Sequence, residues 1–147
     1  MGCLYVNGAT TNLQMYLAHL AIAYADIGQF DHAESCIGEA ITAAEETKEK
    51  WFEAEIHRVK GEIALQSPER HAAKAQACFE RSLEIARAQQ TRSWELRTAM
   101  SLARLWRDQG RRTEAHDLLA PVYGWFTEGF DTLDLKEAKA LLRELAP

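Results

Sequence analysis

The sequence predicts an all-α fold, a right-handed solenoid of three helix pairs followed by a C-terminal capping helix. Apolar residues recur at the 3.6-residue spacing of amphipathic helices, and no stretch alternates as a strand would. Similar features return about every 41 residues along the chain. Its 147 residues include only 3 Pro and 8 Gly, which argues against a loop-rich β fold.

The repeat is marked by small and aromatic residues at equivalent places in successive units. The markers are Gly28 and Gly110; Ala33, Ala75 and Ala115; Cys36 and Cys78; and Trp51 and Trp94. Their separations of 40, 42 and 43 residues, and the double step of 82, agree on one period. A repeated unit must stack on its neighbours to bury its apolar face, so the period predicts an array.

The first repeat, residues 12–48, is expected to hold helices over 12–27 and 31–47. Gly28 suits the left-handed conformation that follows a helix, and Asp31 is expected to cap the second helix. Residues 1–11 read as a loose N-terminal arm.

The second repeat, residues 51–90, is expected to hold helices over 51–66 and 70–90, separated by the helix breaker Pro68. The third repeat, residues 92–124, is expected to hold helices over 92–109 and 113–124. Asp134 and Glu137 then have the spacing of a capping box, which predicts a capping helix over 134–145. Residues 12–147 are therefore expected to form one domain.

Composition excludes several classes of protein. A net charge of −5 is unlike that of a generally basic nucleic-acid binder. The longest apolar stretch is far too short to span a membrane, and the N-terminus lacks the pattern of a secretory signal. Three cysteines give no disulfide framework, and Cys36 and Cys78 are expected to be small core residues. We expect a cytoplasmic protein without a cofactor.

The repeat resembles the tetratricopeptide repeat. The resemblance rests on Leu20-Ala21-x-x-Tyr24-x-x-x-Gly28-x-Phe30-x-x-Ala33 and on Leu102-Ala103-x-x-Trp106-x-x-x-Gly110-x-x-x-x-Ala115. Small residues in these patterns let paired helices approach closely. The period of 41 departs from the usual 34 and implies longer helices.

A narrower resemblance is carried by three further segments. They are Trp51-Phe-Glu-Ala-Glu-Ile-His-Arg58, Ser93-Trp-Glu-Leu-Arg97, and Ala120-Pro-Val-Tyr-Gly-Trp-Phe126. They are similar to the C-terminal repeat region of bacterial adenylate/guanylate cyclases that carry an ATPase module. Related repeats occur in LuxR-like and maltose-regulator-type transcription activators.

That resemblance implies a non-catalytic regulatory module for protein–protein interaction, the tail of a larger bacterial signalling protein. The alternative is a small-ligand sensor domain, as in the transcription activators, with a pocket between repeats. No phosphate-binding loop, hydrolase elbow or zinc-protease motif is present. His32 and Cys36 lie four residues apart without a second pair, and Glu53 and His57 read as a surface pair. We therefore expect no catalytic residue and no metal site.

The partner-binding groove is expected along the first helix of each pair. Its face changes from apolar in the first repeat to mixed in the second and basic in the third. The groove residues singled out are Arg58, Glu62, Arg97, Met100, Arg104 and Arg107. Residues 81–112 hold eight arginines and a net charge of +5, against −10 for the rest.

Two interpretations of the arginines stay open at this stage. They form either a solvated face paired with glutamates at i+4 or a site for a protein or acidic peptide, with nucleic acid disfavoured. Met15, Ala18 and Ile22 are expected to form an uncovered apolar patch on the first helix. Such a patch predicts self-association of the chain, for which a homodimer through the N-terminal repeat is the expected form.

Overall fold

The structure, a computed structural model, describes residues 10–48 and 50–147. All regular secondary structure in these residues is α-helical. The helices are α1 (Thr10–Asp26), α2 (Phe30–Thr47), α3 (Glu53–Gln66), α4 (Ala72–Gln89), α5 (Arg92–Asp108), α6 (Arg112–Gly124) and α7 (Leu133–Leu145). The all-α prediction is confirmed, and each predicted helix boundary lies within two residues of the observed one. Residues 1–9 of the expected arm lie outside the described residues, and Thr10 already belongs to α1.

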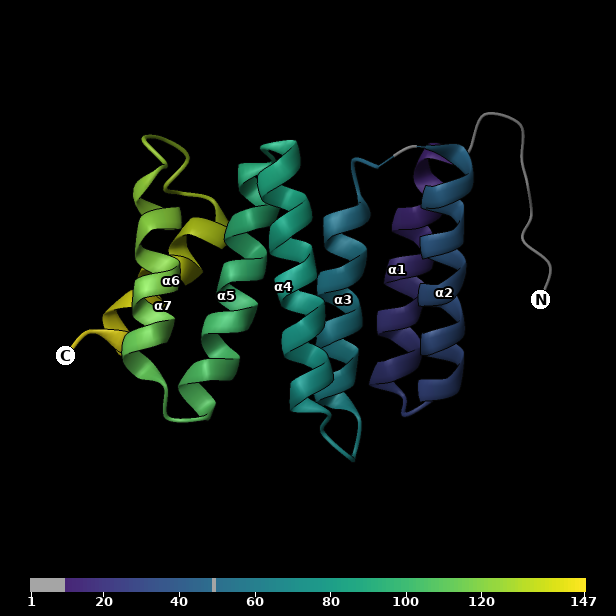
Figure 1. Cartoon of the computed structure of the whole chain (residues 1–147), viewed down its shortest axis with the longest axis horizontal. Coiled ribbons are helices and arrows are strands. Elements are labelled where there is room, and N and C mark those ends of the chain that lie inside the picture. The colour runs from purple at the N-terminus through teal and green to yellow at the C-terminus, as the bar shows by residue number, and fades with distance from the viewer. Residues whose placement is uncertain (1–9, 49) are drawn as a thin grey trace.

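The helices form a row of antiparallel pairs, with α1 and α2 at one end and α6 and α7 at the other (Figure 1). Helix α1 pairs with α2, α3 with α4, and α5 with α6. Helices α1, α3, α5 and α7 also contact one another in succession. These four helices therefore form one layer, the first-helix layer, and α2, α4 and α6 lie together against one side of this layer.

Two glycines end the first helix of their pairs as predicted. Gly28 and Gly110 both have φ of +81°, a conformation that residues with a side chain rarely adopt. Each follows its helix and lets the chain turn back into the next one. In the middle pair α3 ends at Gln66, just before Pro68, as the helix-breaking role of proline predicts.

Both predicted N-terminal caps are wrong. Helix α2 has Gln29 at its cap position and no side-chain cap, while Asp31 lies in the first turn. Helix α7 begins one residue before Asp134, its cap residue is Thr132, and no side-chain cap forms there either. Asp31 and Asp134 still lie near helix N-termini, where the helix dipole favours a negative charge.

The buried apolar residues fall into two main clusters. One cluster joins α1, α2 and α3, and the other joins α3 to α7. Close approach between paired helices is clearest at Gly61, where an added Cβ would lie 2.6 Å from Cε1 of Phe79. Cys36 and Cys78 are buried, in agreement with their predicted place in the core. None of the described helices combines the length and the apolar character needed to cross a bilayer.

Candidate partner-binding surface

Five of the six predicted groove residues reach the surface of the first-helix layer. Arg58 and Glu62 come from α3, and Arg97, Arg104 and Arg107 come from α5. Met100 is the exception, because its side chain is 2% exposed and belongs to the α3–α7 core cluster. Its prediction as a partner contact is wrong, since the packing of α7 beside α5 extends the core past this position.

A buried carboxylate, Glu55, organises the surface where α3 meets α5. The Glu55 side chain is 5% exposed. Arg58 donates from Nε to Oε2 at 2.9 Å and from Nη2 to Oε1 at 2.6 Å, and Nη1 of Arg97 lies 3.0 Å from Oε1. The guanidinium groups of Arg58 and Arg97 therefore compensate the negative charge of Glu55, because a buried carboxylate is costly without oppositely charged hydrogen-bond donors.

Arg58 is part of this interior network and offers little to a partner. Its side chain is 13% exposed, and Nη1 also lies 3.4 Å from Oγ of Ser101 and 3.6 Å from Oε1 of Glu62. Burial opposes its charge, but the hydrogen bonds and negative charges of Glu55, together with Glu62 and Asp134, outweigh burial and raise the pKa of the guanidinium. Arg58 is therefore mainly a structural ion-pair residue, and its role as a partner contact stays a prediction.

Helix α7 lies beside α5 and pairs with its arginines. Nε of Arg97 lies 3.8 Å from Oδ2 of Asp134, and Nη2 of Arg104 lies 3.4 Å from Oε2 of Glu137. Further along α5, Nη1 of Arg107 lies 3.1 Å from a carboxylate oxygen of α7, that of Glu144. The carboxylate partners of these three arginines thus come from α7. The alternative in which they pair with glutamates four residues away on α5 is not observed for them.

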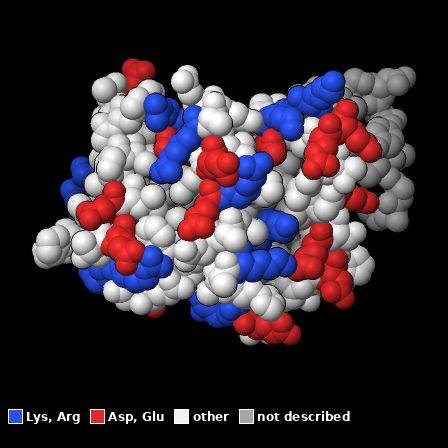
Figure 2. All heavy atoms as spheres, in the orientation of Figure 1, with Lys and Arg blue, Asp and Glu red and all other residues white. Residues whose placement is uncertain are grey.

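All eight arginines of residues 81–112 have a partner within the chain. The carboxylate partners are Glu84 for Arg81, Glu95 for Arg87 and Arg92, and Glu114 for Arg111. Arg97, Arg104 and Arg107 pair as described above, and Arg112 donates to the backbone carbonyl of Glu144. On the face formed by α2, α4 and α6, basic and acidic groups likewise lie side by side (Figure 2). The net charge of +5 on residues 81–112 therefore does not produce a surface of unpaired arginines.

The ion pairs between α5 and α7 are exposed enough to exchange. The side chains of Arg97, Arg104 and Arg107 are 36%, 40% and 27% exposed. Ion pairs of this exposure contribute about 0–1 kcal/mol. Carboxylates of a partner can therefore replace those of α7 at small cost, which is the binding chemistry this surface offers.

The predicted apolar patch on α1 is mostly covered. Ala18 is fully buried, and Met15 and Ile22 are half-buried against the α1–α3 core cluster. The prediction of an uncovered patch is wrong for Ala18, because α1 packs against both α2 and α3. The large apolar side chains exposed near this end are Tyr16 at 61% and Ile27 at 71%. A homodimer through the N-terminal repeat stays a prediction.

The histidines and cysteines of the described residues do not converge. No group of three metal-binding side chains forms within 10–48 and 50–147. The ring of His32 stacks on Tyr24, with centroids 5.1 Å apart. Burial lowers the pKa of His57 despite the opposing charge of Glu53. No described side chains are therefore assembled for metal binding.

No protein-family model and no curated protein sequence matches this chain.

Proposed function

We propose that the protein is a non-catalytic, tetratricopeptide-like right-handed solenoid that binds an acidic protein partner on its first-helix layer. The observation that carries the proposal is the row of half-exposed arginines on α5, each paired with a carboxylate of α7. Because these arginines are partly exposed, their α7 carboxylates can be exchanged for carboxylates of a partner.

The arrangement of the helices supports the repeat assignment. Helices α1, α3, α5 and α7 succeed one another in one layer, and Gly28 and Gly110 turn the chain at equivalent points. An extended layer of first helices is the surface that stacked helical repeats use for partners. The residues that resemble the repeat region of cyclase-type proteins support placing the module in a larger bacterial signalling protein.

Helix α7 indicates the chemistry of the partner. Its residues Asp134, Glu137 and Glu144 are spaced by three and seven, so they share one face of the helix. A partner segment with acidic residues at this spacing matches Arg97, Arg104 and Arg107. Arginine suits this role because its planar group donates two parallel hydrogen bonds to a carboxylate.

Two triple variants with equal loss of charge test the proposal. The first replaces Arg97, Arg104 and Arg107 with Gln. The second replaces with Gln three paired arginines in α4 and at the start of α6, namely Arg81, Arg111 and Arg112. Both proteins are immobilised and partner proteins are quantified by mass spectrometry against the unaltered chain, with helical content checked by circular dichroism. We expect partners to be lost only from the first variant. Equal recovery by both variants would show that the α5 arginines are not the binding surface.

A further inference from the structure

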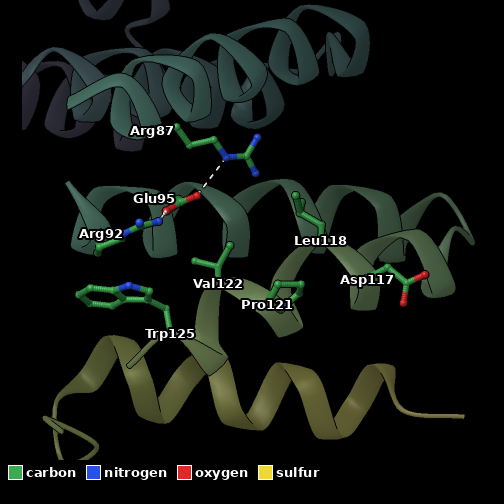
Figure 3. Close-up of a pocket in the computed structure, with 8 residues that line it drawn as sticks. All are labelled: Arg87, Arg92, Glu95, Asp117, Leu118, Pro121, Val122 and Trp125. Atoms are coloured by element: carbon green, nitrogen blue, oxygen red, sulfur yellow. Dashed lines mark hydrogen bonds and ion pairs between the residues drawn. The ribbon is translucent and has the colours of Figure 1, made fainter. Parts of the chain in front are cut away.

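A pocket of about 290 Å³ lies between α4 and α6, on the opposite side of α5 from the α3 and α7 ion pairs. Arg87 of α4 stands on one wall, and Arg92 and Glu95 come from the first turn of α5 (Figure 3). The facing wall is apolar and includes Pro121 and Val122 of α6, with Trp125 directly after that helix. The pocket therefore combines two guanidinium groups with an apolar surface.

A buried carboxylate fixes the two arginines. The side chain of Glu95 is 7% exposed. It accepts a hydrogen bond of 3.0 Å from Nε of Arg87 and one of 3.1 Å from Nη1 of Arg92. Both Nη groups of Arg87, and Nε and Nη2 of Arg92, have no acceptor within the described part of the chain. These donors are held in place beside the pocket and remain available.

The Glu55 network is a similar arrangement whose arginines have additional partners within the chain. There too a buried carboxylate holds two arginines, Arg58 and Arg97. Further donors of these two arginines lie near groups of the chain itself: Nη1 of Arg58 near Ser101 and Glu62, and Nε of Arg97 near Asp134. The pocket repeats the arrangement without these acceptors.

Trp125 supplies a surface for a planar group. Its side chain is among the exposed large apolar residues, at 55%, and Arg92 lies over the ring with Cζ 5.0 Å from the centroid. Aromatic rings bury large areas against such a surface and prefer offset-stacked or edge-to-face arrangements with an indole. Pro121 and Val122 extend the apolar wall beside it.

We propose that this pocket binds a small monoanionic carboxylate that carries an aromatic ring. The carboxylate bridges Arg87 and Arg92, and the ring lies against Trp125 and Pro121. Two arginines and Glu95 leave one net positive charge, which matches a single carboxylate. Asp117 also lines the pocket, but its side chain is 72% exposed and its charge is screened by water. The site is independent of the proposed partner surface, because it lies on the α4 and α6 side.

Phenylacetate is the probe, titrated into the full chain and followed by the indole ¹H–¹⁵N signal of Trp125. That signal is identified by its absence from Trp125→Phe. Phenylacetamide has the ring without the charge, and acetate has the charge without the ring. We expect a saturable shift with phenylacetate. Phenylacetamide and acetate should bind at least about tenfold more weakly, because charge-assisted hydrogen bonds are stronger than neutral ones and acetate lacks the ring.

Arg87→Gln is expected to reduce phenylacetate binding to the level of phenylacetamide. The matched control is Arg111→Gln, which removes a guanidinium 4.6 Å above the ring of Trp106 and should leave binding unchanged. The proposal is overturned if phenylacetate gives no saturable shift, if phenylacetamide binds equally well, or if Arg87→Gln binds like the unaltered chain. The comparison of the three probes uses the unaltered protein, so it does not depend on how any variant folds.

Discussion

Gly61 lies where α3 meets the ring of Phe79 on α4. A Cβ at this position would lie 2.6 Å from Cε1 and 2.8 Å from Cδ1 of a ring that is fully buried. Because the ring is enclosed by the core, Gly61→Ala forces it to shift. We expect the free energy of unfolding to fall by about 1–3 kcal/mol, measured by urea denaturation.

Gly38 in the middle of α2 is the matched control for this substitution. Nothing lies within 4 Å of a Cβ added there, and the residue is exposed. Gly38→Ala is expected to raise the free energy of unfolding by about 0.5–1 kcal/mol, since alanine loses less backbone entropy in a helix. A stabilising Gly61→Ala would show that α3 and α4 do not approach this closely.

His57 predicts a dependence of stability on pH. Burial lowers its pKa from the ordinary value of 6.5, with Lys60 and Arg81 adding to burial and Glu53 opposing it. Below 6.5 the unfolded chain therefore takes up a proton that the folded protein does not. This contribution to stability is present above pH 6.5 and is lost as the pH falls towards the lower folded pKa. Urea denaturation across this range should show a steeper acid-side loss for the unaltered chain than for His57→Gln; parallel curves would contradict the assignment.

At the residue scale, sequence patterns predicted backbone roles better than surface roles. Gly28 and Gly110 were predictable because a helix end demands one backbone conformation. Met100 and Ala18 were not, because helical spacing identifies a face of a helix without showing what packs on it. Glu55 is a charged residue whose burial no local pattern indicates, and only the approach of α5 explains it.

At the scale of the element, α7 is held mainly by its apolar face. Leu141 is 4% exposed in the α3–α7 core cluster, whereas Leu133 on the same helix is 69% exposed. Leu141→Ala should therefore lower the free energy of unfolding by about 2–5 kcal/mol. Leu133→Ala, the same chemical change outside the core, should stay within about 0.5 kcal/mol. Thermal or urea unfolding measures both, and equal effects would mean that α7 does not dock on the core.

Helix limits were predictable to within two residues because the apolar period, Gly and Pro all act locally. The contacts that α7 makes with α5 were harder to predict from the sequence. Asp134 and Glu137 have the spacing of a capping box, yet their carboxylates lie against Arg97 and Arg104 of α5. A local pattern and a contact between helices can use the same residues, and only the packed structure separates them.

At the scale of the molecule, the net charge of −5 hides an uneven distribution. Residues 10–47 carry six acidic residues and no lysine or arginine. Within the described chain Asp26 accepts a hydrogen bond from Gln66, and Glu34 pairs with Lys74. The other four have no ion-pair partner among the described residues: Asp31, Glu39, Glu45 and Glu46. Unpaired negative charge is therefore concentrated on the α1–α2 pair, while the arginines of residues 81–112 have partners within the chain.

This distribution predicts that α1 and α2 open before the rest of the molecule. Six of the nine residues that the pair contributes to its core cluster are alanines, which bury little apolar area. Among the described helices α1 contacts only α2 and α3, whereas α5 contacts α3, α4, α6 and α7. Native-state hydrogen exchange should therefore show lower opening free energies for amides of α1 and α2 than for those of α5.

Changing the salt concentration distinguishes two causes of the lower stability of α1 and α2: repulsion among their carboxylates and the small apolar area that their alanines bury. Raising the ionic strength from about 0.1 M to about 1 M shortens the screening length from about 10 Å to about 3 Å and relieves repulsion among the carboxylates. Protection of α1 and α2 should then rise relative to α5, with the remaining difference due to the alanine-rich core. Equal opening free energies in all helices at low salt would show that the row of pairs unfolds as one cooperative unit.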